Sequence, residues 1–434
     1  MSIAAVPRGL GGLVSPLLGP VAALDGRLLE PDDALLHSAW CELPGDGGAG
    51  GLVRAGGGWS PSPARAAAAA VGEAVERLCA ATAGDGRAVT ACAMELGLTA
   101  LDPARIRLFL PGQLEGRTLV APDTSTMLRW LPAMRLPDLA PAWLPAQLVL
   151  LEPPGDGGAE PPITIATSNG LACGPDWWSA IRSGLLELVE RDAFTLTWAS
   201  RLELPQLRWE GVPVLERLER RLAPSGLCSA ALDLSALLGV PVVLAVVRTP
   251  PGKPGPSAVG AAAGVTAEDA AARALAEAHA AFAAARAYRR GRGGRTFADD
   301  GSDLASFDDR VLFYADPRRA GPLAFLTASP ERRHVGDIAP LPGDGPREHV
   351  TALCQRIAAR TGGTAYAADL TGCDAAAAGV HVVRVVCPEL CPVDPVHALR
   401  FLGVPRLLTG AHAAGLLPRP LRVEEVNPHP HPFP

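Results

Sequence analysis

Apolar and polar positions along the chain predict a mixture of long helices and short strands. Residues 63–83 and 176–200 repeat apolar side chains at helical spacing. Thr266, with Asp269 three positions later, predicts the N-terminus of a third long helix. Shorter apolar runs are expected to be strands, at 163–167, 241–247, 311–314 and 381–386.

The order of these elements predicts the fold class. Strands and helices alternate without the regular strand–helix–strand rhythm of a doubly wound nucleotide-binding sheet. We therefore predict an α+β (mixed α/β) fold, in which helices pack on mixed or antiparallel sheets. Three segments are expected: a loop-rich N-terminal segment at 1–50, a main domain at 51–426 and a proline-rich tail at 427–434.

Two of the predicted helices carry the same polar triplet on an apolar background. The triplet, Glu-x-x-Glu-Arg, occurs at Glu73, Glu76 and Arg77 and again at Glu187, Glu190 and Arg191. Its members stand at i, i+3 and i+4 and so share one helical face. Acids on a mostly buried helix need partners, because an unpaired buried charge is costly.

Two such faces brought together would gather four carboxylates and two guanidinium groups. Mg²⁺ takes carboxylate, water and phosphate oxygens, and arginine binds phosphate oxygens well. The pattern therefore favours a site for Mg²⁺ and a nucleotide. The alternative is a pair of ordinary salt-bridged helices with no binding role.

Composition and charge exclude several kinds of partner. The 434 residues carry a formal net charge of −6, so a nucleic-acid partner is not expected. The densest basic stretch lies at 286–295 and is either a solvated helix end or a contact for an acidic peptide segment. The single lysine, Lys253, is not part of a G-x-x-x-x-G-K-[ST] loop, so ATP would have to be bound by another scheme.

The sequence also predicts the compartment. No apolar run reaches the roughly 20 residues that a membrane-spanning helix needs. The first residues lack the charged and apolar regions of a signal peptide. Nine cysteines without a Cys-x-x-Cys pair indicate reduced thiols, so we expect a cytoplasmic protein with no membrane partner.

Residues 427–434 alternate proline with other residues. Alternate prolines impose an extended, polyproline-like shape that loses little entropy on ordering. Such a tail can enter a cleft, whereas the alternative is a frayed terminus.

Taken together, these features resemble the YcaO family, in the azoline-forming branch that matures ribosomally made peptides. The resemblance covers nearly the whole chain and rests on residues 13–17, 73–77, 168–170, 187–192, 273–277, 313–314 and 427–434. It implies a YcaO-type fold around a central nucleotide cleft. It also implies ATP-dependent cyclodehydration, in which a Cys, Ser or Thr side chain of a precursor peptide attacks the preceding backbone carbonyl. The carbonyl oxygen takes the γ-phosphoryl group of ATP, and phosphate leaves to give a thiazoline or oxazoline.

The resemblance implies roles for single residues. Mg²⁺ would be held by Glu73, Glu76, Glu187 and Glu190. The nucleotide would be contacted by Ser168, Asn169, Arg77, Arg191, Glu277 and His279. Catalysis would use Glu187, Arg191 and the terminal carboxylate of Pro434, the last as a general base or positioning group. Phosphoryl transfer needs charge neutralisation and positioning more than a strong nucleophile, which suits this set.

The chain departs from the family at several nucleotide-contacting positions. Residues other than the usual Lys, Ser, Asn and Gln stand there, at Gly57, Ala69, Ala172, Pro175 and His279. Two hypotheses remain open: a cyclodehydratase subunit, or a degenerate non-catalytic scaffold that supports an active homologue. A third, a YcaO protein that makes thioamides or amidines, is disfavoured by the proline-alternating tail.

The resemblance implies polypeptide partners as well. The substrate would be a ribosomally synthesised precursor peptide. We expect a separate E1-like protein to bind its leader, because this chain has neither the length nor the zinc-type Cys-x-x-Cys pairs for that domain. A homodimer is compatible with these expectations.

Overall fold

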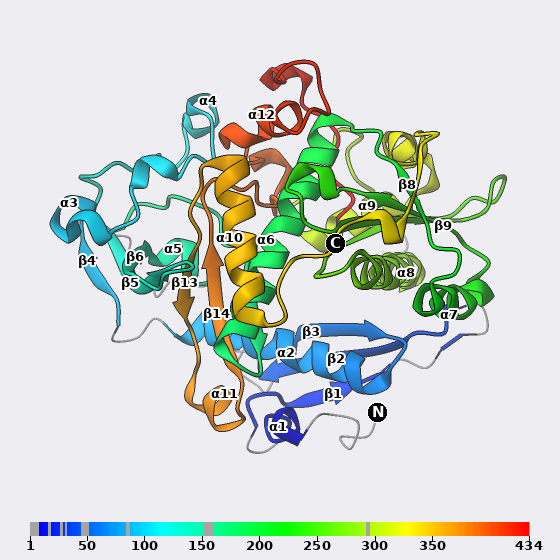
Figure 1. Ribbon diagram of the computed structural model, residues 1–434, viewed down its shortest axis with the longest axis horizontal. Coiled ribbons are helices and arrows are strands. Elements are labelled where there is room, and N and C mark those ends of the chain that lie inside the picture. Colours follow the sequence, from blue (N-terminus) through cyan, green and yellow to red (C-terminus); the bar gives the residue numbers. More distant parts are fainter. Residues whose placement is uncertain are drawn as a thin grey trace. The chain divides into compact units, whose positions relative to one another are not determined.

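The structure is a computed structural model, shown in Figure 1. It describes residues 8–15, 19–26, 29–30, 33–44, 52–83, 87–151, 160–291 and 296–433. Contacts divide the chain into two units. Unit 1 consists of Met1–Leu28, His37–Leu188 and Gly343–Leu390, and unit 2 of Leu29–Leu36, Val189–Pro342 and Cys391–Pro434. The boundaries drawn from the sequence, at 50 and 426, stay a prediction.

Unit 1 contains two antiparallel sheets among its described residues. The smaller sheet has the order β1-β2-β3, with β1 at Ala23–Asp25, β2 at His37–Pro44 and β3 at Leu52–Ser60. The larger has the order β4-β5-β13-β14-β7, and β6 pairs with β5. Its strands are β4 (Val89–Ala91), β5 (Leu128–Arg135), β6 (Pro141–Pro145), β7 (Leu171–Gly174), β13 (Tyr366–Asp369) and β14 (His381–Val386).

The helices of unit 1 range from one turn to six. They are α1 (Arg8–Gly11), α2 (Pro63–Thr82), α3 (Ala93–Leu96), α4 (Pro111–Leu114), α5 (Ala146–Val149), α10 (Pro346–Thr361), α11 (Cys373–Ala377) and the first half of α6 (Trp177–Ser200). The division between the units falls inside α6, between Leu188 and Val189.

Helix α2 lies against β2 and β3 (Figure 1). Its contact face is made of fully buried alanines, including Ala66 and Ala70. A methyl group placed on Gly56 or Gly58 of β3 would overlap the carbonyl oxygens of those two alanines. Small residues on both sides therefore let the helix backbone lie directly on the strand, which fixes the position of the carboxylates one turn further along.

Unit 2 is built on one five-stranded sheet of order β11-β10-β9-β8-β12. The strands are β8 (Gln206–Arg208), β9 (Cys228–Asp233), β10 (Val242–Arg248), β11 (Ser257–Ala263) and β12 (Arg332–His334). Only the β8–β12 pair is parallel among them. The helices are α7 (Pro213–Leu222), α8 (Ala267–Gly291), α9 (Phe307–Ala315), α12 (Pro405–Ala413) and the second half of α6.

Helix α8 covers β10 and β11, whose residues are almost all buried. A methyl group on Gly260 would lie 2.4 Å from the backbone nitrogen of Ala278. A glycine in a strand beneath an alanine-rich helix therefore lets α8 pack closely on its sheet, as in the contact between α2 and β3.

A buried ion pair joins distant segments of unit 2. Asp192 of α6 is fully buried and accepts hydrogen bonds from Arg406 Nε at 2.8 Å and from the backbone N–H of Cys391 at 2.9 Å. Arg406 also donates to the carbonyl oxygen of Leu237 at 3.3 Å. Because both charges are paired and hydrogen-bonded, their burial is tolerated.

The predicted α+β class is confirmed, as are the three long helices and the strands at 241–247 and 381–386. The prediction of a strand at 311–314 was wrong, since these residues lie in α9, whose N-cap Ser306 accepts from the N–H of Asp309. The first fifty residues were expected to be loop-rich, yet they contain β1 and β2.

The strand predicted at 163–167 was also wrong. Its backbone is bound by side chains instead: Ile163 donates to Gln147 Oε1 at 2.9 Å, and the Thr167 carbonyl accepts from Arg384 at 2.6 Å. The strand begins only at Leu171, where β7 pairs with β14. Within the described part of the chain, no helix is both long enough and apolar enough to cross a membrane.

Candidate active site

Glu73 lies on the partly exposed edge of α2. One of its carboxylate oxygens accepts from Arg77 at 2.6 Å, and the other accepts from the backbone N–H of Gly57 at 2.7 Å. The side chains of Glu73 and Arg77 are 36% and 43% exposed. The structure thus places Arg77 beside its own helix neighbour, where the pair is worth at most about 1 kcal/mol.

Glu76, one turn further, reaches from α2 to β7. It accepts from the backbone N–H of Cys173 in β7 at 2.7 Å. Burial, and then the negative charges of Glu187 and Glu73, raise its pKa from 4.5 to about 8, although the hydrogen bond from Cys173 opposes this. Unit 1 therefore brings Glu76 and Glu187 close enough for their negative charges to repel.

Arg384 was missed by the sequence reasoning. It lies in the middle of β14, is 4% exposed, and donates to the carbonyl oxygens of Leu148 at 3.1 Å and Thr167 at 2.6 Å. Burial lowers its pKa to about 10, while the charge of Glu187 opposes this. Its Nη1 has no hydrogen-bond partner among the described residues. The sequence feature that could have identified Arg384 is its position inside the valine-rich run 382–386.

Ser168, Asn169 and Gly170 form a turn that leads into β7 rather than directly into a helix. The N–H of Leu171 donates to the Ser168 carbonyl at 2.9 Å, and Asn169 donates to Thr167 Oγ1 at 2.9 Å. Gly170 has φ of 79°, and a methyl group there would overlap the Val385 carbonyl. The turn is therefore held in one conformation, with Ser168 exposed.

In unit 2, Glu190 and Glu277 form a second pair of acids. Glu190, with a side chain that is 13% exposed, accepts from the N–H of Ala263 at 3.3 Å. Burial raises its pKa from 4.5 to about 7, which Glu277 reinforces and Arg191 and Arg273 oppose. Arg191 Nε lies 3.7 Å from a Glu190 oxygen. The unit thus holds two acids and two arginines in electrostatic contact.

His279 does not lie with these acids. It stands two residues from Glu277 on α8, a spacing that points side chains to different faces. Its Nε2 is 2.9 Å from Ser229 Oγ of β9, and it is 4% exposed. Burial lowers its pKa to about 4, so the ring stays neutral at physiological pH.

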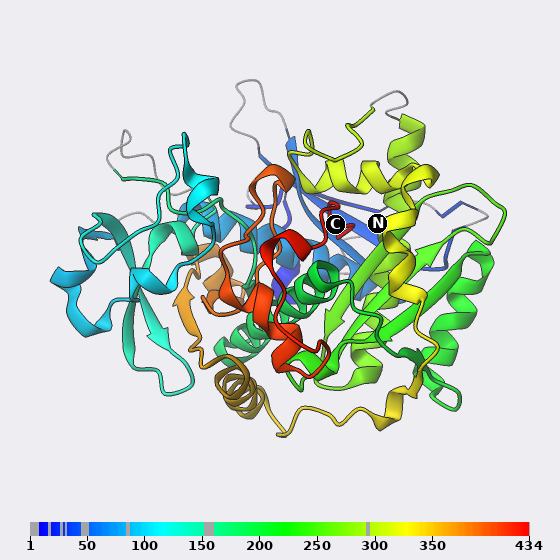
Figure 2. The same ribbon diagram turned by 90° about the horizontal axis from the view of Figure 1, so that it is seen from above.

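The proline-rich tail, residues 427–433, lies beside α6 within unit 2 (Figure 2). The side chain of Asn427 donates to the Trp198 carbonyl, and Trp198 Nε1 donates to the His429 carbonyl, both at 3.1 Å. Phe433 is fully buried, and its ring lies 4.3 Å from the guanidinium carbon of Arg191. Pro434, predicted to supply a catalytic carboxylate, lies outside the described residues.

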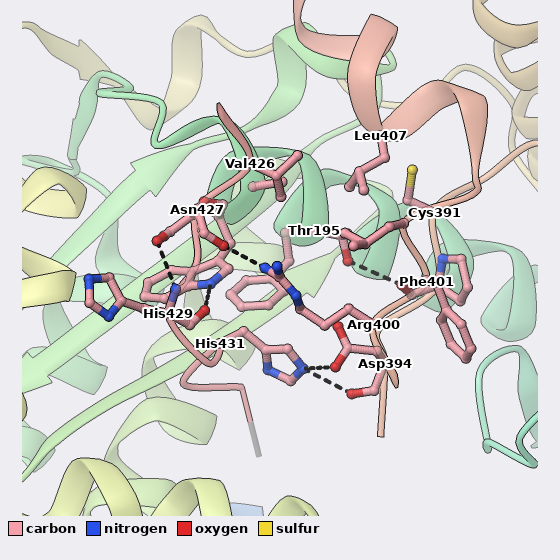
Figure 3. Close-up of a pocket in the computed structure, with 15 residues that line it drawn as sticks. Thr195, Cys391, Asp394, Arg400, Phe401, Leu407, Val426, Asn427, His429 and His431 are labelled. Atoms are coloured by element: carbon pink, nitrogen blue, oxygen red, sulfur yellow. Dashed lines mark hydrogen bonds and ion pairs between the residues drawn. The ribbon is translucent and has the colours of Figure 1, made fainter. Parts of the chain in front are cut away.

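Polar side chains hold the last residues of the tail, and Figure 3 shows His431 beside Asp394. Arg310 of α9 is fully buried and pairs with Asp394 at 2.5 Å, and His431 Nε2 lies 3.0 Å from the Asp394 carbonyl oxygen. Tyr314 donates to the Pro430 carbonyl at 2.5 Å. A cavity of about 30 Å³ remains between the tail and α6, enough for one water molecule.

The two acid pairs fit Mg²⁺ and a polyphosphate. Each contains a partly buried carboxylate whose pKa is raised by desolvation and by a neighbouring acid, so a divalent cation would relieve the repulsion. No group of three or more His, Cys, Asp or Glu side chains in the described residues is placed to hold a metal by itself. That arrangement suits Mg²⁺, which usually takes one or two carboxylates together with water and phosphate oxygens.

Comparisons with known proteins agree with this geometry. Residues 57–391 match the family model of YcaO cyclodehydratases, described as ATP- and Mg²⁺-binding. An uncharacterized protein in the tfuA 3′ region of Rhizobium leguminosarum bv. trifolii is 32% identical over 134 residues, which are 29% of this chain and 31% of that protein. The chain thus spans about a third of that relative's length in the match.

Two solved structures share the fold. A heterocyclase in complex with substrate and cofactor aligns with a TM-score of 0.78 at 24% identity, over 98% of this chain and 57% of that one. A YcaO protein from Methanopyrus kandleri bound with AMPPCP and Mg²⁺ aligns with a TM-score of 0.62 at 22% identity, over 85% and 86% of the two chains. With its fold and most of its length matched, the chain belongs to the YcaO cyclodehydratase family, whose members bind ATP and Mg²⁺.

Proposed function

We propose that this chain is the ATP-dependent cyclodehydratase subunit of a peptide-modifying system. It converts Cys, Ser or Thr of a ribosomal precursor peptide into thiazoline or oxazoline. The observation that carries the proposal is the pairing of partly buried carboxylates, Glu76 with Glu187 and Glu190 with Glu277, in a member of this family.

The four acids of the two triplets, Glu73, Glu76, Glu187 and Glu190, would hold Mg²⁺. When bound, Mg²⁺ neutralises phosphate charge, and ATP supplies the phosphoryl group that turns the amide oxygen into a leaving group. Glu277 adds a carboxylate beside Glu190. Helix α6 contributes Glu187 to the first pair and Glu190 to the second.

Arginines and the polar turn complete the proposed site. Arg384 binds the Thr167 carbonyl and thereby fixes the turn that carries Ser168 and Asn169, the predicted nucleotide contacts. Arg191, stacked on Phe433, would neutralise phosphate or the amide oxygen as charge develops there. The tail would then act by holding Arg191, and a catalytic role for Pro434 stays a prediction.

The substrate and the partner protein are proposed from the family. The heterocyclase that aligns over 98% of this chain is matched over 57% of its own length. We propose that the leader of the precursor peptide is bound by an E1-like protein, as in the azoline-forming branch that the sequence resembles. A homodimer stays a prediction.

The test is reconstitution of the chain with a precursor peptide and its partner protein, followed by mass spectrometry. We expect the loss of one water per ring, dependent on ATP and Mg²⁺. Glu190→Gln should abolish the loss, whereas Glu424→Gln, the same change at an exposed position, should leave it intact. Unchanged turnover in Glu190→Gln would remove this residue from the site.

A non-catalytic scaffold is the second candidate. It is favoured by the residues at positions 57, 69, 172, 175 and 279, which lack the polar groups usual in the family. In particular, His279 is bound to Ser229 rather than lying beside Glu277. Calorimetry with Mg²⁺ and ATP separates the two: a scaffold shows no binding heat at millimolar nucleotide, and the enzyme shows saturable binding.

A further inference from the structure

Unit 2 contains a second hollow, which the proposed chemistry does not use. Its volume is about 580 Å³, within the range of roughly 300–1,000 Å³ that is typical of ligand pockets. One wall is the loop between β10 and β11, and the other is the C-terminal end of α8. Four cationic side chains line it: Lys253, Arg286, Arg289 and Arg290. In a chain of net charge −6 this is a local concentration of positive charge.

The loop wall has a defined backbone. Thr249 Oγ1 donates to the Lys253 carbonyl at 2.7 Å, and the Lys253 N–H donates to the Pro250 carbonyl at 3.0 Å. Gly252 takes φ of 80°, which lets the turn close, and four prolines restrict the remainder of residues 249–256. The turn presents the exposed side chain of Lys253, the single lysine of the chain, on the rim of the hollow.

The helix wall already binds an acidic segment of this chain. Arg290 pairs with Glu30 at 2.6 Å, and Arg286 pairs with Asp33. Both acids belong to Leu29–Leu36, the short stretch that unit 2 receives from the N-terminal part of the chain. The end of α8 thus binds the carboxylates of Glu30 and Asp33. Arg289 and Lys253 add two exposed cations to the same hollow.

We propose that this hollow, the basic groove, binds an acidic, extended peptide segment of another polypeptide. Lys253 and Arg289 contact its carboxylates. The lining also includes the half-buried Leu227, which contacts an apolar side chain of the peptide. An extended peptide fits better than a nucleic acid because half of the cationic groups already carry carboxylate partners, and the remaining charge is too small to hold a phosphate backbone.

The test is binding of a short, fluorescently labelled peptide of alternating Glu and Leu to the full-length chain, followed by fluorescence anisotropy without ATP or Mg²⁺. We expect saturable binding that weakens about tenfold in the double variant Lys253→Glu, Arg289→Glu, since each exposed ion pair contributes modestly. Neutral replacements, Lys253→Met with Arg289→Gln, should give an intermediate loss, about threefold. Raising the salt from about 50 to 200 mM should also weaken binding, because exposed charges are screened.

The matched control is Arg217→Glu with Arg360→Glu, which makes the same charge change at exposed positions outside the groove. It should bind as the unaltered chain does. Equal binding by the groove variant and the control would overturn the proposal. So would equal binding of a peptide with Gln in place of Glu, or tighter binding of a single-stranded oligonucleotide or of vesicles of anionic lipid. Circular dichroism of each variant separates lost contacts from lost folding.

Discussion

Replacing Glu190 with Gln should make the metal-free protein more stable at alkaline pH. Glu190 is mostly buried and lies in the field of Glu277, so its ionised form is disfavoured in the folded state. Gln has nearly the same shape and no charge. A residue kept for binding a cation is expected to cost stability when the cation is absent.

The magnitude follows from the pKa. A shift from 4.5 to about 7 corresponds to roughly 3 kcal/mol between the two protonation states, at about 1.4 kcal/mol per pH unit. Because the folded state holds this proton more tightly than the unfolded state, stability falls as pH rises from 4.5 through 7 and then levels off. The advantage of Glu190→Gln should therefore be near zero at about pH 4 and approach its upper limit, about 3 kcal/mol, at about pH 8.

Urea denaturation in EDTA, followed by tryptophan fluorescence at several pH values, measures this difference directly. Added Mg²⁺ should stabilise the unaltered chain at pH 8 and have little effect on the variant, since a ligand that binds only the folded state stabilises it. The control variant Glu424→Gln, at an exposed position, should differ from the unaltered chain by a free energy of unfolding that does not change with pH. The reasoning is refuted if Glu190→Gln is no more stable than the unaltered chain at pH 8, or if the difference in stability does not change with pH. The ionised carboxylate of Glu190 would then not destabilise the folded state.

Three further changes test the packing and the tail. Gly58→Ala should cost about 1–3 kcal/mol in denaturant titrations because its methyl group overlaps the α2 backbone, whereas Gly57→Ala, with open space around it, should be close to neutral. Arg406→Met leaves Asp192 buried without its cation and should cost about 3–5 kcal/mol; a loss below 1 kcal/mol would show that Asp192 takes up a proton or water at little cost. Phe433→Ala should lower kcat about tenfold, with KM for ATP little changed, if the ring holds the Arg191 guanidinium through a contact worth about 1–2 kcal/mol. An unchanged kcat would make the tail a purely structural element.

Local patterns predicted the helices and the acids they carry. The Glu-x-x-Glu-Arg spacing sets a shared helical face without help from the rest of the chain, and the structure brings Glu76 and Glu187 into electrostatic contact. The strand prediction for 311–314 was wrong because four consecutive apolar residues suit a strand or a buried helix equally. The N-cap Ser306 favours the helix that the structure shows.

Contacts between residues far apart in the sequence could not be predicted from local patterns. Arg384 gains its importance from carbonyl groups at 148 and 167, and Arg310 from Asp394. In the sequence, Arg384 was visible only as a charge in an apolar run, and Arg310 only as a cation next to Asp308 and Asp309. Likewise, the family resemblance implied that His279 contacts the nucleotide, and the sequence did not reveal that its ring lies beside Ser229.

The interleaving of the two units has a consequence for synthesis. On a ribosome, the sheet of unit 2 emerges before Arg406, whose guanidinium neutralises Asp192, and unit 1 must wait for β13 and β14 to occupy the middle of its larger sheet. Neither half has its full set of partners until most of the chain has been translated. The nascent protein therefore exposes unfinished sheet edges for much of its elongation, and overproduction should depend on chaperones more than it would for a chain with consecutive domains.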